Sequence, residues 1–375
     1  MLKHMSYRQT RNSRAFILVL SLAALVACSA QREVPKKLEI AEEYEFADEQ
    51  ETAKELATVL QNAVAERYES GAFKRDAHPK SHGCLKAEFS VNKNLDERLK
   101  VGIFSEERNY PAYVRYSTGS GKVESDTQKE FLGMGIKVMG VDGEKLIPNE
   151  KFTQDFLFIS TNVEAVRTSK EFLKVVKASL AGSPMSYFFN PSDLHIKEFL
   201  AVLSSKKHHP SPLEIRYWST VPYLYGNGQA VKYSVKRCGP ATREVPDTLT
   251  DNYLREAMVD QLSMGDACFD FMVQFQKDPY NQPIEDAFIE WDEDVTPFIP
   301  IAKLNIPKQI FDTPEQNAFC ENLSLNPWHA RVEHRPLGNM NRARKLVYNK
   351  ISEYRHSMNG IQRIEPTGDE RFSIR

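Results

Sequence analysis

The chain has 375 residues, of which 49 are basic and 51 are acidic, so its formal net charge is −2. With 41% apolar and 27% charged residues, it is long enough for one large globular domain or two small ones. It contains no basic tract and no interleaving of basic with aromatic residues, so we expect no nucleic-acid partner.

The first 27 residues are typical of a targeting signal. The basic residues end at Arg14, and residues 15–27 form an apolar run that is too short to span a bilayer comfortably. The run closes with Leu25-Val26-Ala27-Cys28, which resembles the lipobox of bacterial lipoproteins. The resemblance implies cleavage before Cys28 and acyl chains on Cys28 that hold the protein on a membrane surface. An ordinary cleaved signal and an uncleaved anchor are the alternatives.

The mature chain is therefore expected in the bacterial cell envelope, facing the periplasm. Ser29 next to the cysteine favours onward transfer to the outer membrane. Removal of residues 1–27 takes away four basic residues and leaves 45 basic against 51 acidic residues, so the mature protein is mildly acidic.

The remaining pattern predicts a polar tether over residues 28–49 and a single domain over residues 50–375. Helical periodicity is found in 52–68, 169–180, 193–203, 254–262 and 340–354. Runs typical of strands are 85–91, 112–117, 135–139, 156–160, 217–225, 229–236 and 269–275. Turn signals occur at Asp142-Gly143 and at Gly226-Asn227-Gly228, and 296–307 is an extended, Pro-rich crossing. Antiparallel strands followed by helices predict an α+β domain with a closed β-barrel surrounded by helices.

Four cysteines remain after Cys28, namely Cys84, Cys238, Cys268 and Cys320. Their even number and the oxidising compartment allow one or two disulfides, and buried free thiols are the alternative. No Cys/His spacing suggests zinc.

Two short motifs far apart in the chain suggest haem chemistry. In Arg344-Lys-Leu-Val-Tyr348 the tyrosine follows the arginine by four residues in a predicted helix, so both side chains share one face. A guanidinium beside a phenol favours the phenolate, and a phenolate oxygen can serve as an axial haem ligand. In Arg75-Asp-Ala-His78 the histidine could move protons on the other side of such a haem.

Ordered blocks over about residues 73–356 resemble the catalase superfamily. They are His78-Pro-Lys-Ser-His-Gly-Cys, Tyr110-Pro-Ala-Tyr-Val-Arg-Tyr-Ser117-Thr, Gly133-Met-Gly-Ile-Lys137, Asn227-Gly-Gln-Ala-Val-Lys-Tyr, Phe298-Ile-Pro-Ile-Ala-Lys-Leu and Cys320-Glu-Asn-Leu-Ser-Leu-Asn-Pro-Trp328. The chain is too short for the extra C-terminal domain of large catalases, so it resembles a compact catalase-related haem protein.

The resemblance implies a catalase-like barrel with a haem b pocket between the barrel and the C-terminal helix. It implies that Tyr348 is the axial iron ligand, that His78 is the proton-transferring residue and that Ser117 fixes its tautomer. Arg75, Arg115 and Arg344 match family positions near the haem. Large catalases are tetramers, so a homo-oligomer is left open here.

The chain also departs from the family pattern at two places. Catalases carry a distal asparagine in a G-N-N-T-P pattern, whereas residues 151–155 read Lys-Phe-Thr-Gln-Asp, so we expect Thr153 or Gln154 to supply the hydrogen bond. The family's R-D-P-R-G is here Lys129-Glu-Phe-Leu-Gly133, so Lys129 takes the place of a propionate-side arginine. Both changes are compatible with haem binding and put rapid dismutation of hydrogen peroxide in doubt.

Three functions are compatible with these residues. The first is a haem peroxidase with weak catalase activity on hydrogen peroxide or organic hydroperoxides. The second is conversion of fatty-acid hydroperoxides, as in the allene oxide synthases of this superfamily. The third is a non-enzymatic haem-binding lipoprotein, which would not need His78 and Ser117 as a proton shuttle.

Overall fold

The structure, a computed structural model, describes residues 35–373, which lie in the compact unit Val34–Arg375. The α-helices are α1 (Glu49–Arg67), α2 (Ser169–Leu180), α3 (Met185–Phe188), α4 (Ile196–Ser205), α5 (Tyr253–Met264), α6 (Pro314–Asn322) and α7 (Asn339–Met358). The strands are β1 (Ser81–Val91), β2 (Asn109–Thr118), β3 (Leu132–Met139), β4 (Thr153–Ile159), β5 (Phe189–Asn190), β6 (Asp193–Leu194), β7 (Tyr217–Trp218), β8 (Tyr223–Leu224), β9 (Ala230–Arg237), β10 (Ala267–Phe275) and β11 (Ile299–Ile306). Three short 3₁₀ turns cover Glu97–Leu99, Gly102–Phe104 and Val332–His334.

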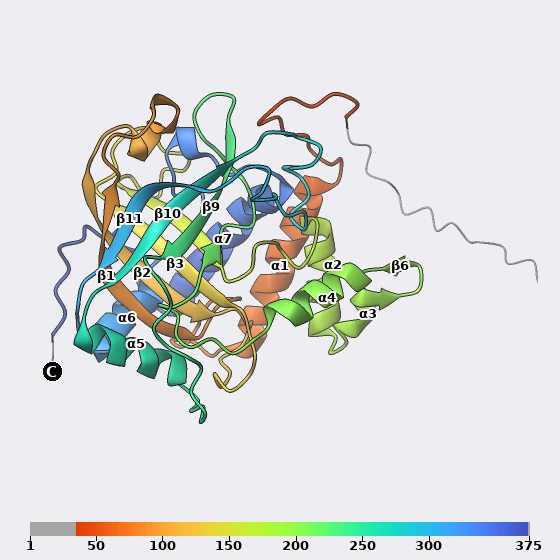
Figure 1. Cartoon of the computed structure of the whole chain (residues 1–375). Helices are drawn as coiled ribbons and strands as arrows, with labels where there is room; N and C mark the ends of the chain where they lie inside the picture. Colours follow the sequence, from red (N-terminus) through yellow and green to blue (C-terminus); the bar gives the residue numbers. More distant parts are fainter. Residues whose placement is uncertain (1–34, 374–375) are drawn as a thin grey trace, which may run out of the picture. The chain divides into compact units, whose positions relative to one another are not determined.

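Eight antiparallel strands of the described chain close into a barrel (Figure 1). Their order is β10-β11-β1-β2-β3-β4-β7-β9, β9 pairs back with β10, and β8 extends from β9. The β1–β2 pairing runs from Ser90 opposite Asn109 to Ser81 opposite Ser117. Closure leaves no free edge on these eight strands. The α+β barrel architecture predicted from the sequence is confirmed.

Aromatic side chains fill the interior of the barrel. Alternate residues of a strand point to opposite faces, and the inward positions of four strands contribute Phe89, Phe156, Tyr233 and Phe271, each at most 1% exposed. The ring of Phe156 lies 4.8 Å from that of Phe271 and 5.2 Å from that of Tyr233. Because these aromatic side chains occupy the inside of the barrel, we expect a cofactor site against its outer face.

Three helices cover part of that outer face. α1 packs along α7, and α2 packs against both; the apolar residues between them are Leu56, Ala57, Leu60, Leu173, Val347 and Ile351. Figure 1 shows α7 beside α1, with α2, α3 and α4 on the far side of α1 from the barrel. α5 and α6 lie against β1. The C-terminal helix is thus fixed next to the barrel by a small apolar core of its own.

The structure corrects three local predictions. The strand predicted over 217–225 is interrupted by Thr220, whose φ is +60°, so only its two ends pair as β7 and β8. The helix predicted over 193–203 begins at Ile196, because Asp193 and Leu194 pair with β5. The Asp142-Gly143 turn does not make a tight hairpin, since β3 ends at Met139 and β4 starts only at Thr153.

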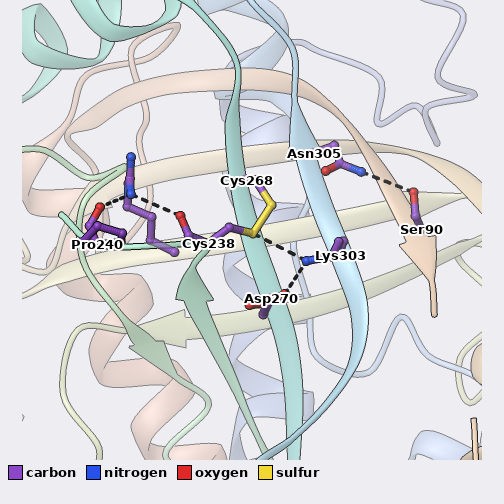
Figure 2. The surroundings of a disulfide bond; sticks show 8 residues. Ser90, Cys238, Pro240, Cys268, Asp270, Lys303 and Asn305 are labelled. Carbon is purple, nitrogen blue, oxygen red and sulfur yellow. Dashed lines mark hydrogen bonds and ion pairs between the residues drawn. A yellow bond between two sulfur atoms is a disulfide. The ribbon is translucent and has the colours of Figure 1, made fainter. Parts of the chain in front are cut away.

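A disulfide joins Cys238, which follows β9, to Cys268 in β10, and Figure 2 shows it beside the closing strand pair of the barrel. The Cys238 N–H also donates to the Cys268 carbonyl at 2.9 Å. Cys84 and Cys320 are free thiols, both buried. One of the two disulfides allowed by the sequence is therefore present among the described cysteines.

The predicted tether is bound to the body of the protein where the structure describes it. The N–H of Ala41 donates to Gln276 Oε1 at 2.8 Å, and Glu43 forms ion pairs with Arg335 and Arg342. The predicted signal peptide, residues 1–27, and the predicted lipidation site Cys28 lie outside the described residues. None of the helices within residues 35–373 is long and apolar enough to cross a membrane.

Candidate haem site

A cavity lies between the outer face of β2–β4 and α7. It encloses about 930 Å³ of space free of atoms, a figure that includes the open solvent at its mouth. Six predicted residues from distant parts of the chain line it: Arg75, His78, Arg115, Ser117, Arg344 and Tyr348. The two motifs that suggested haem chemistry therefore meet at one cavity.

The backbone and two neighbours hold His78 in place. Its φ is +57°, a conformation uncommon for a residue with a Cβ that is found more often at functional sites. Its carbonyl accepts a hydrogen bond from Arg115 Nη2 at 2.8 Å, and its Nδ1 lies 3.1 Å from Ser117 Oγ. When Nδ1–H donates to Ser117, the other ring nitrogen keeps its lone pair and can act as a base.

Burial, followed by the nearby charges of Arg115, Arg344 and Arg75, lowers the pKa of His78 to about 3. The imidazole is therefore neutral at ordinary pH. A close approach by β3 completes its surroundings, because a Cβ on Gly133 would lie 2.5 Å from the His78 ring. Only glycine leaves room for the imidazole at this position.

Tyr348 projects from α7 into the cavity, but its partnership with Arg344 differs from the prediction. Arg344 Nη2 donates to Glu164 Oε1 at 2.8 Å, and the same oxygen accepts from Thr220 Oγ1 at 2.7 Å. Burial raises the pKa of Tyr348, and the charge of Arg344 opposes that effect without outweighing it. Arg344 thus favours the phenolate, as predicted, but burial has the larger effect, so an ionised Tyr348 would need a cation at its oxygen.

Glu164 and Thr220 belong to this part of the site, and the sequence did not reveal them. Both line the cavity from irregular segments. Nothing in the spacing of either residue distinguishes it from a surface loop residue. The strained backbone at Thr220 places its hydroxyl on Glu164, which in turn orients the Arg344 guanidinium beside Tyr348.

A cluster of arginines forms another part of the cavity wall. Arg75 pairs with Glu321 at 3.2 Å, while Arg115 and Arg355 are 3% and 2% exposed. Burial and the charges of Arg75 and Arg115 act together to lower the pKa of Arg355 to about 9. Three guanidinium groups facing one carboxylate leave an excess of positive charge, which suits a dianionic ligand.

The sequence did not lead us to predict Arg355 as a cavity residue, although its spacing from Tyr348 could have indicated it. It follows Tyr348 by seven residues, so the two lie on the same face of α7 two turns apart. Its guanidinium Nη1 donates to the Glu321 carbonyl at 2.5 Å. That contact holds the side chain at the cavity next to Arg75.

Three predicted residues do not reach the cavity. Lys129 is exposed in the loop before β3. Thr153 Oγ1 donates to Glu150 at 2.5 Å, and Gln154 Oε1 accepts from the Arg331 N–H at 2.9 Å. Thr153 and Gln154 are buried at the start of β4, whereas the cavity touches only the end of that strand. The prediction that one of them supplies a distal hydrogen bond is therefore wrong, and the described lining contains no asparagine or glutamine.

A buried cluster elsewhere has the donor set of a metal site but already contains its cation. Glu150, Asp155 and His329 have ligand atoms within 4.8 Å of one another. The ammonium of Lys137 lies between the carboxylates, 2.7 Å from Asp155 Oδ1, and Arg363 Nη2 donates to His329 Nε2 at 2.7 Å. The protein thus neutralises the two acids itself, so this cluster is structural.

The residues of the cavity fit a haem. Arg115 Nε is buried and has no hydrogen-bond partner among the described residues, as expected of a donor waiting for a carboxylate such as a propionate. On β3, glycine at 133 lets the His78 ring pack close to the strand, and glycine at 135 does the same for Leu325, which a Cβ would meet at 2.7 Å. Apolar side chains of Leu157, Ile159 and Leu325 supply the remaining surface.

Comparison with solved structures identifies the fold. The chain is similar to a bacterial catalase, with a TM-score of 0.60 and 16% identity over 92% of this chain and 69% of that one. It is also similar to a fungal catalase (TM-score 0.57, 14% identity, 78% of this chain and 61% of that one) and to catalase A from Saccharomyces cerevisiae (0.56, 13%, 91% and 72%). This is a catalase-like fold. No family model and no curated protein matches the sequence.

The catalase-like barrel predicted from the ordered sequence blocks is thereby confirmed. At 13–16% identity the likeness establishes the fold alone. The chain spans 61% of the length of the fungal catalase.

Proposed function

We propose that this protein is a haem-dependent enzyme that decomposes peroxides, with haem b in the cavity and Tyr348 as its axial ligand. The observation that carries the proposal is that the His78–Ser117 pair and Tyr348 line the same cavity. The catalase-like fold supports it. A simple haem carrier would not need a neutral, oriented imidazole in the pocket, so we favour an enzyme over a non-enzymatic haem-binding lipoprotein.

The residues that line the cavity have separate roles in this reaction. Bound haem would supply the iron centre at which the peroxide O–O bond is cleaved. His78, neutral because burial lowers its pKa to about 3, takes the proton from one peroxide oxygen and returns it to the other, and Ser117 holds the tautomer that makes this transfer work. Arg75, Arg115 and Arg355 would bind the propionates, and Glu164 keeps Arg344 directed at Tyr348.

The cavity lining favours organic hydroperoxides over rapid dismutation of hydrogen peroxide. It lacks an amide donor among the described residues, and several of its walls are apolar side chains. A second candidate follows from the same observation: conversion of fatty-acid hydroperoxides without release of oxygen. The two candidates share every residue role given above and differ in their products.

The test is turnover by the haem-loaded protein and its His78→Gln variant. We expect the variant to keep the haem absorption and to lose about 10²- to 10⁴-fold in peroxide turnover. His208→Gln, at a partly exposed loop histidine, is the control and should leave turnover unchanged. Wild-type turnover in His78→Gln would refute the mechanism. Oxygen release from hydrogen peroxide, compared with loss of a fatty-acid hydroperoxide without oxygen, separates the two candidates.

We also propose that the mature protein is a lipoprotein of the bacterial cell envelope, anchored through acylated Cys28. The support is the Leu-Val-Ala-Cys sequence at the end of an apolar run. The mass of the N-terminal peptide from the cell-made protein tests the idea. An N-terminus other than acylated Cys28 would contradict it.

A further inference from the structure

An unusually apolar surface lies on the segment that follows α2. Seven of the sixteen large apolar side chains exposed on the described residues fall between residues 180 and 203, each 45–58% exposed. We call this set the apolar patch; its members are Leu180, Met185, Phe189, Leu194, Ile196, Leu200 and Leu203. Scattered apolar residues on a surface are ordinary, whereas a concentration of this kind marks an interaction site.

The backbone brings the patch residues together. Phe189 and Leu194 are directly opposite each other in the β5–β6 pair. Ile196, Leu200 and Leu203 follow one another at intervals of four and three residues, so they form one face of α4. The neighbouring face of α4 packs Phe199 and Val202 against the core. α4 is therefore apolar on both of these faces, and its outer side has no cover within the described chain.

The exposed lysines of the segment that carries the patch are not balanced by carboxylates of the same segment. Only two carboxylates occur between residues 180 and 208, and both are neutralised: Glu198 is buried and pairs with Arg167 at 2.9 Å, and Asp193 pairs with Lys174 at 3.1 Å. Lys197 and Lys207 are exposed. An apolar face with lysines beside it has the composition of a helix that lies in the interface of an anionic bilayer.

We propose that the apolar patch inserts into the surface of an anionic lipid membrane. A membrane lies within reach if Cys28 is acylated, because the short stretch of chain from Cys28 to Pro35 spans at most roughly 25 Å. The chain beyond it is bound to the body: the Leu38 N–H donates to Tyr280 at 2.9 Å, and Glu43 pairs with Arg342. Figure 1 places the first described residues and α2–α4 on the α1 side of the barrel. The anchor and the patch would thus act as two contacts with one surface.

A second copy of the chain fits the patch less well than lipid does. A two-fold contact through α4 would place the same surface of both copies face to face. Lys197 and Lys207 of both copies would then be brought into one interface, while the two carboxylates of the segment already pair with Arg167 and Lys174. Anionic lipid headgroups supply the missing negative charge. Insertion of the patch into a membrane requires neither haem nor peroxide turnover.

The experiment uses the full chain, reconstituted into vesicles of phosphatidylethanolamine and phosphatidylglycerol, with an environment-sensitive fluorophore on Leu200→Cys. The protein is used in its lipidated form, in which the sulfur of Cys28 is blocked, and the free thiols of the described residues, Cys84 and Cys320, are buried and stay unlabelled. The matched control is Ile310→Cys, because Ile310 is equally exposed at 60% but lies outside the patch. We expect a blue shift and quenching by brominated lipid for the probe at position 200 and neither for the probe at 310.

Two triple variants test the patch as a whole, and each carries the fluorophore on Met185→Cys instead of Leu200→Cys. Leu194→Ser, Leu200→Ser and Leu203→Ser together should abolish the blue shift. Replacing the exposed Met264, Val295 and Ile310 by serine removes the same number of apolar groups outside the patch and should leave the blue shift unchanged. Equal probe signals at positions 200 and 310 on vesicles that retain the protein would overturn the proposal. A blue shift without vesicles that grows with protein concentration would overturn it too, by identifying a second copy as the occupant.

Discussion

Replacing Gly133 by alanine should impair peroxide turnover without removing the haem site. The added Cβ would lie 2.5 Å from both Cε1 and Nδ1 of His78 and 3.0 Å from Ser117 Oγ. Carbon atoms in contact normally stand about 3.5 to 4.0 Å apart. The imidazole must therefore retreat by about 1 Å, and its 3.1 Å contact with Ser117 Oγ cannot survive unchanged.

The size of the effect follows from that displacement. A misplacement of about 1 Å in a catalytic group costs on the order of 10²-fold in rate, so we expect kcat/KM for peroxide to fall by about that factor. The crowding also costs about 1–3 kcal/mol of stability, as for other overpacked sites. Haem binding should persist, because the change touches neither Tyr348 nor the arginine cluster.

The assay compares kcat/KM and the haem absorption of the wild type, Gly133→Ala and Gly265→Ala. A Cβ on Gly265 would meet nothing within 4 Å, so that variant controls for the loss of a glycine as such. Turnover by folded, haem-loaded Gly133→Ala within about twofold of the wild type would refute the idea that His78 must sit where it does.

Three further predictions concern stability. Lys137→Met leaves two buried carboxylates without their ammonium and should lower the free energy of unfolding, measured by urea denaturation, by about 3–5 kcal/mol; an unchanged midpoint would contradict the structural role of the cluster. Burial lowers the pKa of His209 from its ordinary value of 6.5 to about 4. Between these two pH values the unfolded chain binds the proton and the folded chain does not, so the free energy of unfolding falls as the pH drops from 6.5 to 4. His209→Gln should therefore make the loss of unfolding free energy between pH 7.5 and 5 smaller by about 2 kcal/mol, and an identical pH dependence would disprove that assignment. Replacing Cys238 and Cys268 by serine opens a loop with a sequence separation of 30 and should lower the free energy of unfolding by about 3.6 kcal/mol according to the chain-entropy relation, a value that the same denaturation experiment checks.

Much of the fold could be read from the sequence because its elements are locally encoded. The strand-like runs 112–117 and 269–275 lie within β2 and β10, and the periodicity around Tyr348 predicted α7. Predictions failed where tertiary contacts decide the backbone. Thr220 breaks a strand-like run because its hydroxyl bonds Glu164, a residue 56 positions away along the chain.

The site was predictable where helix or strand spacing defines which residues share a face, and not elsewhere. Arg344 and Tyr348 are four residues apart on one helix, and Arg115 and Ser117 are two apart on one strand, so the cavity receives both pairs. Thr153 and Gln154 were misplaced because their distance along β4 from the cavity depends on strand register, which composition does not fix. Glu164 comes from a loop without periodicity, so its role emerges only in three dimensions.

The central claim is that this cavity holds haem through Tyr348. Titrating haem into the wild type, Tyr348→Phe and Tyr354→Phe while recording absorption spectra tests it most directly, since Tyr354 is on the same helix but does not line the cavity. We predict a saturable ferric spectrum typical of phenolate ligation for the wild type and Tyr354→Phe, and its loss in Tyr348→Phe. An identical spectrum and affinity in all three proteins would contradict the account.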